Sequence, residues 1–219
     1  MNNISAYAAP SAQLSHHEVN NDILVCDVSG STADDSFEQG KSKLETISDA
    51  GREYLTQKKI NRPGDSLALI TYHTCANVVC PFTTIGHNFD ELDGLMARLP
   101  KSIGGGTKLS SGLKAAAKVI RRGNPFGWRD AGPSRILAYS DGYDYEPGAA
   151  VRVAQKLKAS GVLIETFGVG IDPSDVDEAF LKEVASNEDG FVHYRFLGDA
   201  AVMRETFAAL ATGMLTVED

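Results

Sequence analysis

The chain has 219 residues, of which 42% are hydrophobic and 23% charged, as in ordinary globular proteins with one generous domain. Its formal net charge is −8, so attraction to the phosphates of nucleic acids or to anionic membranes is unfavourable. No segment approaches ~18 consecutive apolar residues, the length of a membrane-spanning helix. We therefore expect a globular protein with neither nucleic acid nor membrane as its partner.

The three cysteines are Cys26, Cys75 and Cys80, and no two of them form a CxxC pair. This spacing disfavours a zinc site or a dithiol motif. Cys26 and Cys80 each end an apolar run, which favours buried, reduced thiols. The first residues also lack the basic and apolar stretches of a secretory signal. Together these features predict a cytoplasmic protein.

Residues 1–20 are polar without periodicity, which indicates an N-terminal tail or arm. One domain is predicted over 21–215 and a C-terminal tail over 216–219. Apolar runs between turn signals predict strands, and helically spaced apolar residues predict helices. The predicted strands are 23–26, 67–72, 77–82, 135–139, 162–167 and 191–194. The predicted helices are 35–58, 90–99 (capped by Asn88), 109–122, 149–160, 176–186 and 200–213.

The second and third predicted strands are close enough in sequence to pair as a hairpin. Elsewhere, apolar strands alternate with amphipathic helices. This alternation predicts an α/β fold, doubly wound, with helices on both faces of the central sheet.

The most informative segment is Asp27-Val28-Ser29-Gly30-Ser31, which directly follows the first predicted strand. In an extended backbone the side chains of Asp27, Ser29 and Ser31 point the same way. Gly30 permits the sharp bend from strand to helix. Three oxygen-bearing side chains therefore meet at the carboxyl end of a strand, where open α/β sheets bind their ligands.

Two other segments arrive at the same edge. Thr107 follows Gly104-Gly105-Gly106 at a loop-to-helix junction, and Asp141 follows the fourth predicted strand. With the first segment they make two carboxylates and three hydroxyls, a set of hard oxygen donors that suits Mg²⁺, with Mn²⁺ or Ca²⁺ as alternatives. The five side chains leave room for an oxygen from outside the chain.

These three segments, in this order, resemble the metal-ion-dependent adhesion site of the von Willebrand factor type A domain. The resemblance covers roughly residues 22–213. It implies a mostly parallel sheet with one short antiparallel strand. It also implies that Ser29, Ser31 and Thr107 bind the cation directly or through water, while Asp27 and Asp141 hold it mainly through water.

The resemblance further implies a cation-dependent protein-interaction module, in which an acidic group of the partner completes the coordination. We interpret the chain as an intracellular scaffold or regulator of this kind. Tyr143, Asp144 and Tyr145 are candidate partner contacts because they follow Asp141 closely. Nearby acidic residues, if they rim the site, would raise cation affinity but repel an acidic partner. These residues are Asp34, Asp35, Asp144 and Glu146.

Two alternatives remain open from the sequence. The acidic site could belong to a Mg²⁺-dependent hydrolase or phosphoryl-transfer enzyme with Ser29 or Asp27 as nucleophile. Such an enzyme needs a general base and a phosphate clamp. We find no general base and no GxxxxGK[ST] phosphate loop, and the only basic cluster that could serve as a clamp is Arg121, Arg122 and Arg129. We therefore assign no catalytic residue. The other alternative is a metal-free scaffold in which the motif is vestigial.

Overall fold

The computed structural model describes residues 20–34, 36–38, 40–123, 133–141 and 143–212. Asp35, Arg129, residues 1–19 of the predicted N-terminal tail and the predicted C-terminal tail lie outside the described residues. Within the described part, no helix is long and apolar enough to cross a membrane.

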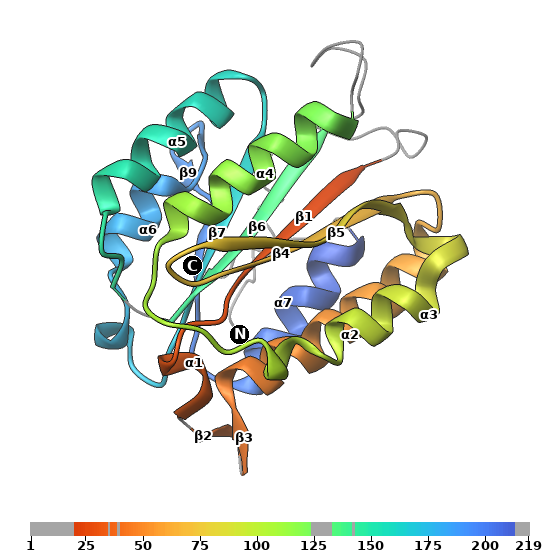
Figure 1. Ribbon diagram of the computed structural model, residues 1–219, viewed down its shortest axis with the longest axis horizontal. Helices are drawn as coiled ribbons and strands as arrows, with labels where there is room; N and C mark the ends of the chain where they lie inside the picture. The colour runs from red at the N-terminus through yellow and green to blue at the C-terminus, as the bar shows by residue number, and fades with distance from the viewer. Residues whose placement is uncertain (1–19, 35, 39, 124–132, 142, 213–219) are drawn as a thin grey trace, which may run out of the picture.

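Six strands form one sheet in the order β10-β7-β6-β1-β4-β5 (Figure 1). All neighbours in it are parallel except β4 and β5, which pair antiparallel as a hairpin. The sheet strands are β1 (Asn21–Asp27), β4 (Ser66–Tyr72), β5 (Ala76–Thr84), β6 (Ser134–Ser140), β7 (Leu163–Val169) and β10 (Tyr194–Leu197). Two short strand pairs lie apart from it, β2 (Ser36–Glu38) with β3 (Lys41–Ser42) and β8 (Asn187–Glu188) with β9 (Phe191–Val192).

Helices cover both faces of this sheet (Figure 1). One face carries α2, α3 and α7, and the other carries α4, α5 and α6. The helices are α1 (Ser31–Asp34), α2 (Lys43–Asn61), α3 (Ile85–Met96), α4 (Leu109–Gly123), α5 (Pro147–Ala159), α6 (Glu178–Val184) and α7 (Ala200–Thr212). Two 3₁₀ turns are η1 (Leu99–Lys101) and η2 (Pro173–Asp175). This architecture confirms the predicted doubly wound α/β class with one antiparallel strand.

The central strand β1 shows why its sequence is a continuous apolar run. Ile23 and Val25 pack into the core beneath α4 and α5, while Leu24 and Cys26 pack into the core beneath α2 and α7. All four side chains are fully buried. A strand covered by helices on both faces has no solvent side, so apolar residues occupy every position.

Two predicted helix starts are wrong. The helix predicted from residue 35 begins only at Lys43, because Gly40 adopts a φ of 78° and the β2–β3 pair precedes it. Ser42 then caps α2 through a reciprocal capping box with Glu45. The helix predicted to start after Asn88 begins at Ile85, and Asn88 is instead a non-helical residue inside it.

Helix α4 lies close against the sheet at Gly112. A Cβ at Gly112 would lie 2.7 Å from Val25 Cγ1 and 3.2 Å from Tyr72 Cδ1, both in fully buried side chains. We expect Gly112→Ala to lower the free energy of unfolding by about 1–3 kcal/mol through overpacking. Urea denaturation measures this loss.

The matched control is Gly94→Ala in α3, where the nearest atom to a new Cβ is the end of Arg98 at 4.0 Å. Helix propensity alone then favours alanine by up to about 1 kcal/mol. If Gly112→Ala and Gly94→Ala had the same free energy of unfolding, close packing at Gly112 would be contradicted.

Candidate metal site

The loop after β1 is held in shape by hydrogen bonds of its own side chains and by one from the neighbouring strand β6. Asp27 Oδ1 accepts from the Ser29 amide at 2.9 Å, and Asp27 Oδ2 accepts from Ser140 Oγ at 3.2 Å. Thr32 donates its hydroxyl to the Ser29 carbonyl at 2.7 Å, which closes the first turn of α1. These contacts fix Ser29 and Ser31 at the carboxyl end of β1.

Three side-chain oxygens converge next to this loop. Ser31 Oγ donates to Asp141 Oδ1 at 2.9 Å, Ser29 Oγ lies 3.1 Å from Ser31 Oγ, and Ser29 Oγ donates to Asp141 Oδ1 at 3.5 Å. Around an octahedral ion with bonds of about 2.1 Å, neighbouring oxygens lie about 3.0 Å apart. The triangle therefore has nearly the size of one face of such a coordination shell.

The glycine-rich loop joins this site through its backbone. The Gly104 amide donates to the Val28 carbonyl at 2.7 Å, and the Gly30 amide donates to the Gly105 carbonyl at 3.2 Å. Thr107 is buried at the end of this loop, just before α4. The structure thus brings four of the predicted residues together through hydrogen bonds. Thr107 follows the glycine-rich loop that is bonded to the same segment, and among the described residues it makes no hydrogen bond to the other four side chains.

Two of the three consecutive glycines lie directly under neighbouring side chains. A Cβ at Gly104 would lie 2.4 Å from the His73 ring, and a Cβ at Gly106 would lie 2.1 Å from the Tyr145 ring. The rings of His73 and Tyr145 therefore rest on the loop backbone, and a larger residue would displace them.

The residues after Asp141 have partly structural roles. Asp144 accepts from the Leu109 amide at 2.5 Å and from the Glu146 amide at 2.6 Å, so it caps the start of α4. Glu146 pairs with Lys108 at 2.8 Å. Tyr143 and Tyr145 are 62% and 71% exposed and remain available to a partner. The Asp34 side chain and Asp35 lie outside what the structure describes.

The site carries more negative charge than its surroundings balance. Burial, and then repulsion by Asp141, raise the pKa of Asp27 to about 7. Burial also raises the pKa of Asp141, although Lys43 opposes this shift. A divalent cation beside the two carboxylates would supply the missing positive charge, and hydroxyl and carboxylate oxygens are ligands that such ions accept. The residues present therefore fit a metal ion.

Lys43 is a member of the site that the sequence analysis missed. It is the first residue of α2, its side chain is 5% exposed, and Lys43 Nζ lies 3.4 Å from Asp141 Oδ2. One signal was available, because a lysine at the start of a helix opposes the helix dipole. Such a placement suggests a partner outside the helix.

The arginines considered as a phosphate clamp lie elsewhere. Arg121 and Arg122 are in the last turn of α4, about 18 Å of helix from its start beside Thr107. Arg129 lies outside the described residues. No group of three or more His, Cys, Asp and Glu side chains suited to a metal occurs in the described part of the chain. The candidate site thus depends on hydroxyls as well as on its two carboxylates.

The parallel α/β sheet and the oxygen cluster at its carboxyl edge define a Rossmann-like domain with a candidate cation site. The sequence matches the family model of the von Willebrand factor type A domain over residues 23–208, and the chain belongs to this family. The family consists of protein-interaction modules that commonly bind a divalent metal at the adhesion site.

Curated relatives and solved structures agree with this assignment. Calcium-activated chloride channel regulator 1 of Homo sapiens is 30% identical over 171 residues, covering 78% of this chain and 16% of that protein. Regulator 4 of Homo sapiens is 29% identical over 193 residues, covering 87% of this chain and 19% of that protein. The chain therefore spans less than a fifth of either relative.

A solved structure shows the same fold with a metal bound. It is proximal thread matrix protein 1 from the mussel byssus, with a zinc-occupied adhesion-site motif. The TM-score is 0.70 at 18% identity, covering 90% of this chain and 48% of that chain.

The predicted cytoplasmic localisation is wrong by these comparisons, because the matching channel regulators are secreted or extracellular proteins. Reduced cysteines do not indicate the cytoplasm here, for a physical reason. Cys26 and Cys80 are buried thiols, and burial is the main cause that raises their pKa values to about 12 and about 11. Such thiols stay protonated and shielded, so their reduced state does not report the compartment.

Proposed function

We propose that this domain binds a protein partner through a divalent cation held by its predicted adhesion site. The observation that carries the proposal is the oxygen triangle of Ser29, Ser31 and Asp141, whose edges of 2.9, 3.1 and 3.5 Å are close in size to one face of a coordination shell. The uncompensated charge of the two carboxylates supports it. Thr107 and Asp27 complete the proposed ligand set.

Mg²⁺ is the proposed ion. The proposed ligands are all hard oxygens, which favour Mg²⁺ over softer metals. Mn²⁺ has similar preferences, and the mussel protein holds zinc at the corresponding motif. When bound, the ion would offer a coordination position to an acidic side chain of the partner.

The chain's own residues would prepare this position. Asp27, held by the Ser29 amide and by Ser140, orients the loop that carries Ser29 and Ser31. The exposed rings of Tyr143 and Tyr145 flank Asp144 and offer apolar contact to a partner. Because Glu146 pairs with Lys108, its repulsion of an acidic partner is partly neutralised.

We propose binding rather than catalysis at this site. The alternative enzyme needs a phosphate clamp, and the described arginines considered for it lie at the far end of α4. Its test is turnover of a generic phosphate ester in Mg²⁺. Turnover that disappears in Asp27→Asn would replace the binding proposal with the enzyme.

Lys43 is expected to weaken cation binding, because its charge lies beside Asp141 where the cation is proposed to bind. Lys43→Met removes this competing charge and keeps an apolar side chain of similar length. We expect Mg²⁺ affinity to rise several-fold in isothermal titration calorimetry. The control is Lys41→Met, which removes an ammonium that pairs with Asp49 in an exposed position. Weaker Mg²⁺ binding by a folded Lys43→Met would show that Lys43 supports the site instead.

The function itself is tested by capturing partners from a native extract on the immobilised domain, in Mg²⁺ and then in EDTA. Ser29→Ala removes one proposed ligand, and Ser102→Ala, in an exposed loop, is its control. A partner retained in Mg²⁺ by wild type and Ser102→Ala, but lost in EDTA and by Ser29→Ala, is the expected result. Retention by all three proteins under both conditions would contradict cation-dependent binding.

A further inference from the structure

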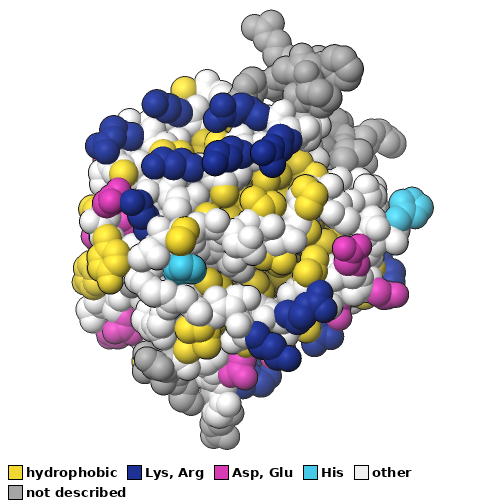
Figure 2. Space-filling model, viewed as in Figure 1, with side chains coloured by type: hydrophobic (Ala, Val, Ile, Leu, Met, Phe, Trp, Pro, Cys, Tyr) yellow, Lys and Arg dark blue, Asp and Glu magenta, His cyan; other side chains and the backbone are white. Residues whose placement is uncertain are grey.

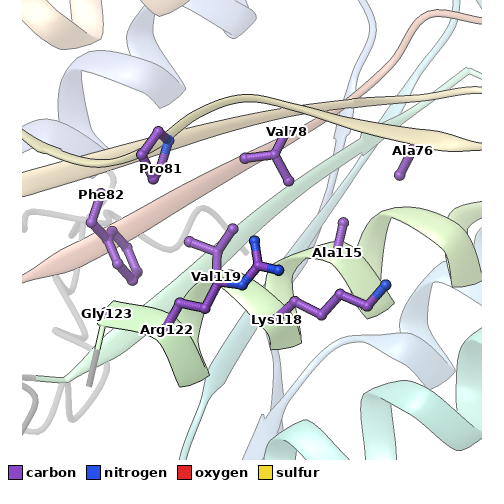
Figure 3. A pocket seen from close by; sticks show the side chains of 9 residues that line it. All are labelled: Ala76, Val78, Pro81, Phe82, Ala115, Lys118, Val119, Arg122 and Gly123. Atoms are coloured by element: carbon purple, nitrogen blue, oxygen red, sulfur yellow. The ribbon is translucent and has the colours of Figure 1, made fainter. Parts of the chain in front are cut away.

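A groove runs between the edge strand β5 and helix α4, away from the proposed metal ligands. Its volume is about 510 Å³, within the range of small-ligand and side-chain pockets. Val78 and Phe82 reach into it from β5, and Ala115 and Val119 form the α4 side (Figure 3). Val78 is 40% exposed, so apolar surface is open to solvent here.

The α4 wall of this groove is basic. Lys118 and Arg122 line it beside the apolar floor (Figure 3). They belong to a larger band of exposed basic side chains over α4 and α5, seen as the dark-blue rows in Figure 2. We call this the basic band, made up of Lys114, Lys118, Arg121, Arg122, Arg152 and Lys156.

The basic band is unusual for this chain. The chain has a net charge of −8, yet neither α4 nor α5 contains an aspartate or glutamate. Glu146, just before α5, is paired with Lys108. Within the described residues, none of the six side chains of the basic band forms an ion pair.

Helix electrostatics explain only part of the basic band. Cations are favourable in the last turn of a helix, which accounts for Arg121 and Arg122 in α4 and for Lys156 in α5. Lys114 and Lys118 lie further from that end, where the dipole effect fades. Positive charge on α4 therefore extends beyond what the stability of the helix requires.

We propose that the groove between β5 and α4 binds an extended, acidic segment of a partner protein. Apolar side chains of the segment would cover Val78 and Phe82, and its carboxylates would face Lys118 and Arg122. Because β5 is the outermost strand of the sheet, an extended segment can lie alongside it without displacing another strand. This surface is separate from the metal site and does not need a cation.

The observations favour a peptide over other polyanions. A nucleic acid backbone or a lipid headgroup layer would meet the positive charges, but neither requires an apolar floor between a strand and a helix. The net charge of −8 also repels an extended anionic surface more than it repels a short segment. An acidic segment with alternating apolar residues matches both the charge and the floor.

The test is fluorescence anisotropy with a labelled peptide of alternating valine and glutamate, in EDTA. A valine–lysine peptide reverses the charge, and a serine–glutamate peptide removes the apolar side chains. The proposal expects saturable binding of the first peptide only, weakened by added salt. Equal binding of the serine–glutamate peptide, tighter binding of single-stranded DNA or phosphatidylserine vesicles, or no binding would overturn it.

Variants locate the binding. The double variant Lys118→Glu with Arg122→Glu is expected to bind the valine–glutamate peptide at least tenfold more weakly than wild type. Val78→Ser is expected to bind it several-fold more weakly. Lys101→Glu, which changes an exposed lysine outside the groove, should bind the peptide with wild-type affinity. Ser29→Ala should also bind like wild type, which separates this surface from the proposed metal site. An unchanged affinity in the double variant would overturn the proposal.

Discussion

Replacing Asp22 by asparagine is expected to lower the free energy of unfolding by about 3–5 kcal/mol at pH 7, because it breaks a buried ion cluster. Asp22 is fully buried at the start of β1. Its carboxylate contacts Arg135 Nε at 2.9 Å and Lys58 Nζ at 2.8 Å, and it accepts a hydrogen bond from Tyr54.

The cations around Asp22 are shared with other acids. Lys58 also pairs with Asp65 at 2.6 Å, and Arg135 lies 3.4 Å from Glu165. Losing the charge of Asp22 leaves Lys58 with Asp65 and Arg135 with the more distant Glu165, so two cations share fewer negative charges. The buried Tyr54 hydroxyl also loses its charged acceptor. The penalty is large because water cannot replace the missing carboxylate.

The effect depends on pH in a defined direction. Burial alone would raise the pKa of Asp22, but the charges and hydrogen bonds of Arg135 and Lys58 outweigh it and hold the pKa below its usual value. A lowered pKa stabilises the fold above the unfolded value of about 3.9, and this stabilisation is lost as the pH falls toward the folded value. The gap between wild type and Asp22→Asn should therefore stay constant from pH 7 to 5 and shrink below pH 4.

Urea denaturation at several pH values measures this gap. Asp49→Asn is the control, because Asp49 forms an exposed pair with Lys41 that contributes little, about 0–1 kcal/mol. A loss of less than 1 kcal/mol for Asp22→Asn would contradict the role given to the cluster.

Asp141→Asn is expected to weaken Mg²⁺ binding at least tenfold. Asp141 accepts hydrogen bonds from both Ser29 and Ser31, and it is one of only two carboxylates in the proposed ligand set. The substitution halves the negative charge available to the cation while keeping the shape of the side chain. Isothermal titration calorimetry measures the change.

Two controls keep this result interpretable. Circular dichroism should show a folded variant, since Lys43 loses its buried partner and some stability with it. Asp175→Asn changes an exposed carboxylate in η2 and should leave Mg²⁺ affinity as in wild type. Wild-type affinity in a folded Asp141→Asn would remove Asp141 from the ligand set.

Local patterns allowed the fold to be predicted well. The apolar run of β1 and the alternation of strands with helices reflect burial on both faces, which is a property of each segment itself. The convergence of Asp27, Ser29, Ser31 and Asp141 could be predicted for the same reason, and their role as metal ligands stays a prediction. Asp27, Ser29 and Ser31 share one turn, while Thr107 and Asp141 each follow a recognisable loop or strand.

The features that were missed depend on contacts between distant segments. Lys43 reaches Asp141 across 98 positions of sequence, and Asp144 caps a helix that starts 35 residues earlier. The start of α2 was misplaced because Gly40 and the capping box at Ser42 overrode a helical pattern of apolar residues. Contacts between segments so far apart in the chain leave no periodic pattern in the sequence.

A cation site at the end of β1 is tested most directly by a Mg²⁺ titration of the wild-type domain, followed by its amide NMR shifts. We expect saturable shifts, with one ion per chain, concentrated at Asp27–Ser31, in the loop before Thr107, and next to Asp141. EDTA should reverse them. Absence of saturable shifts at millimolar Mg²⁺, or shifts concentrated at another surface, would contradict a cation site at the end of β1.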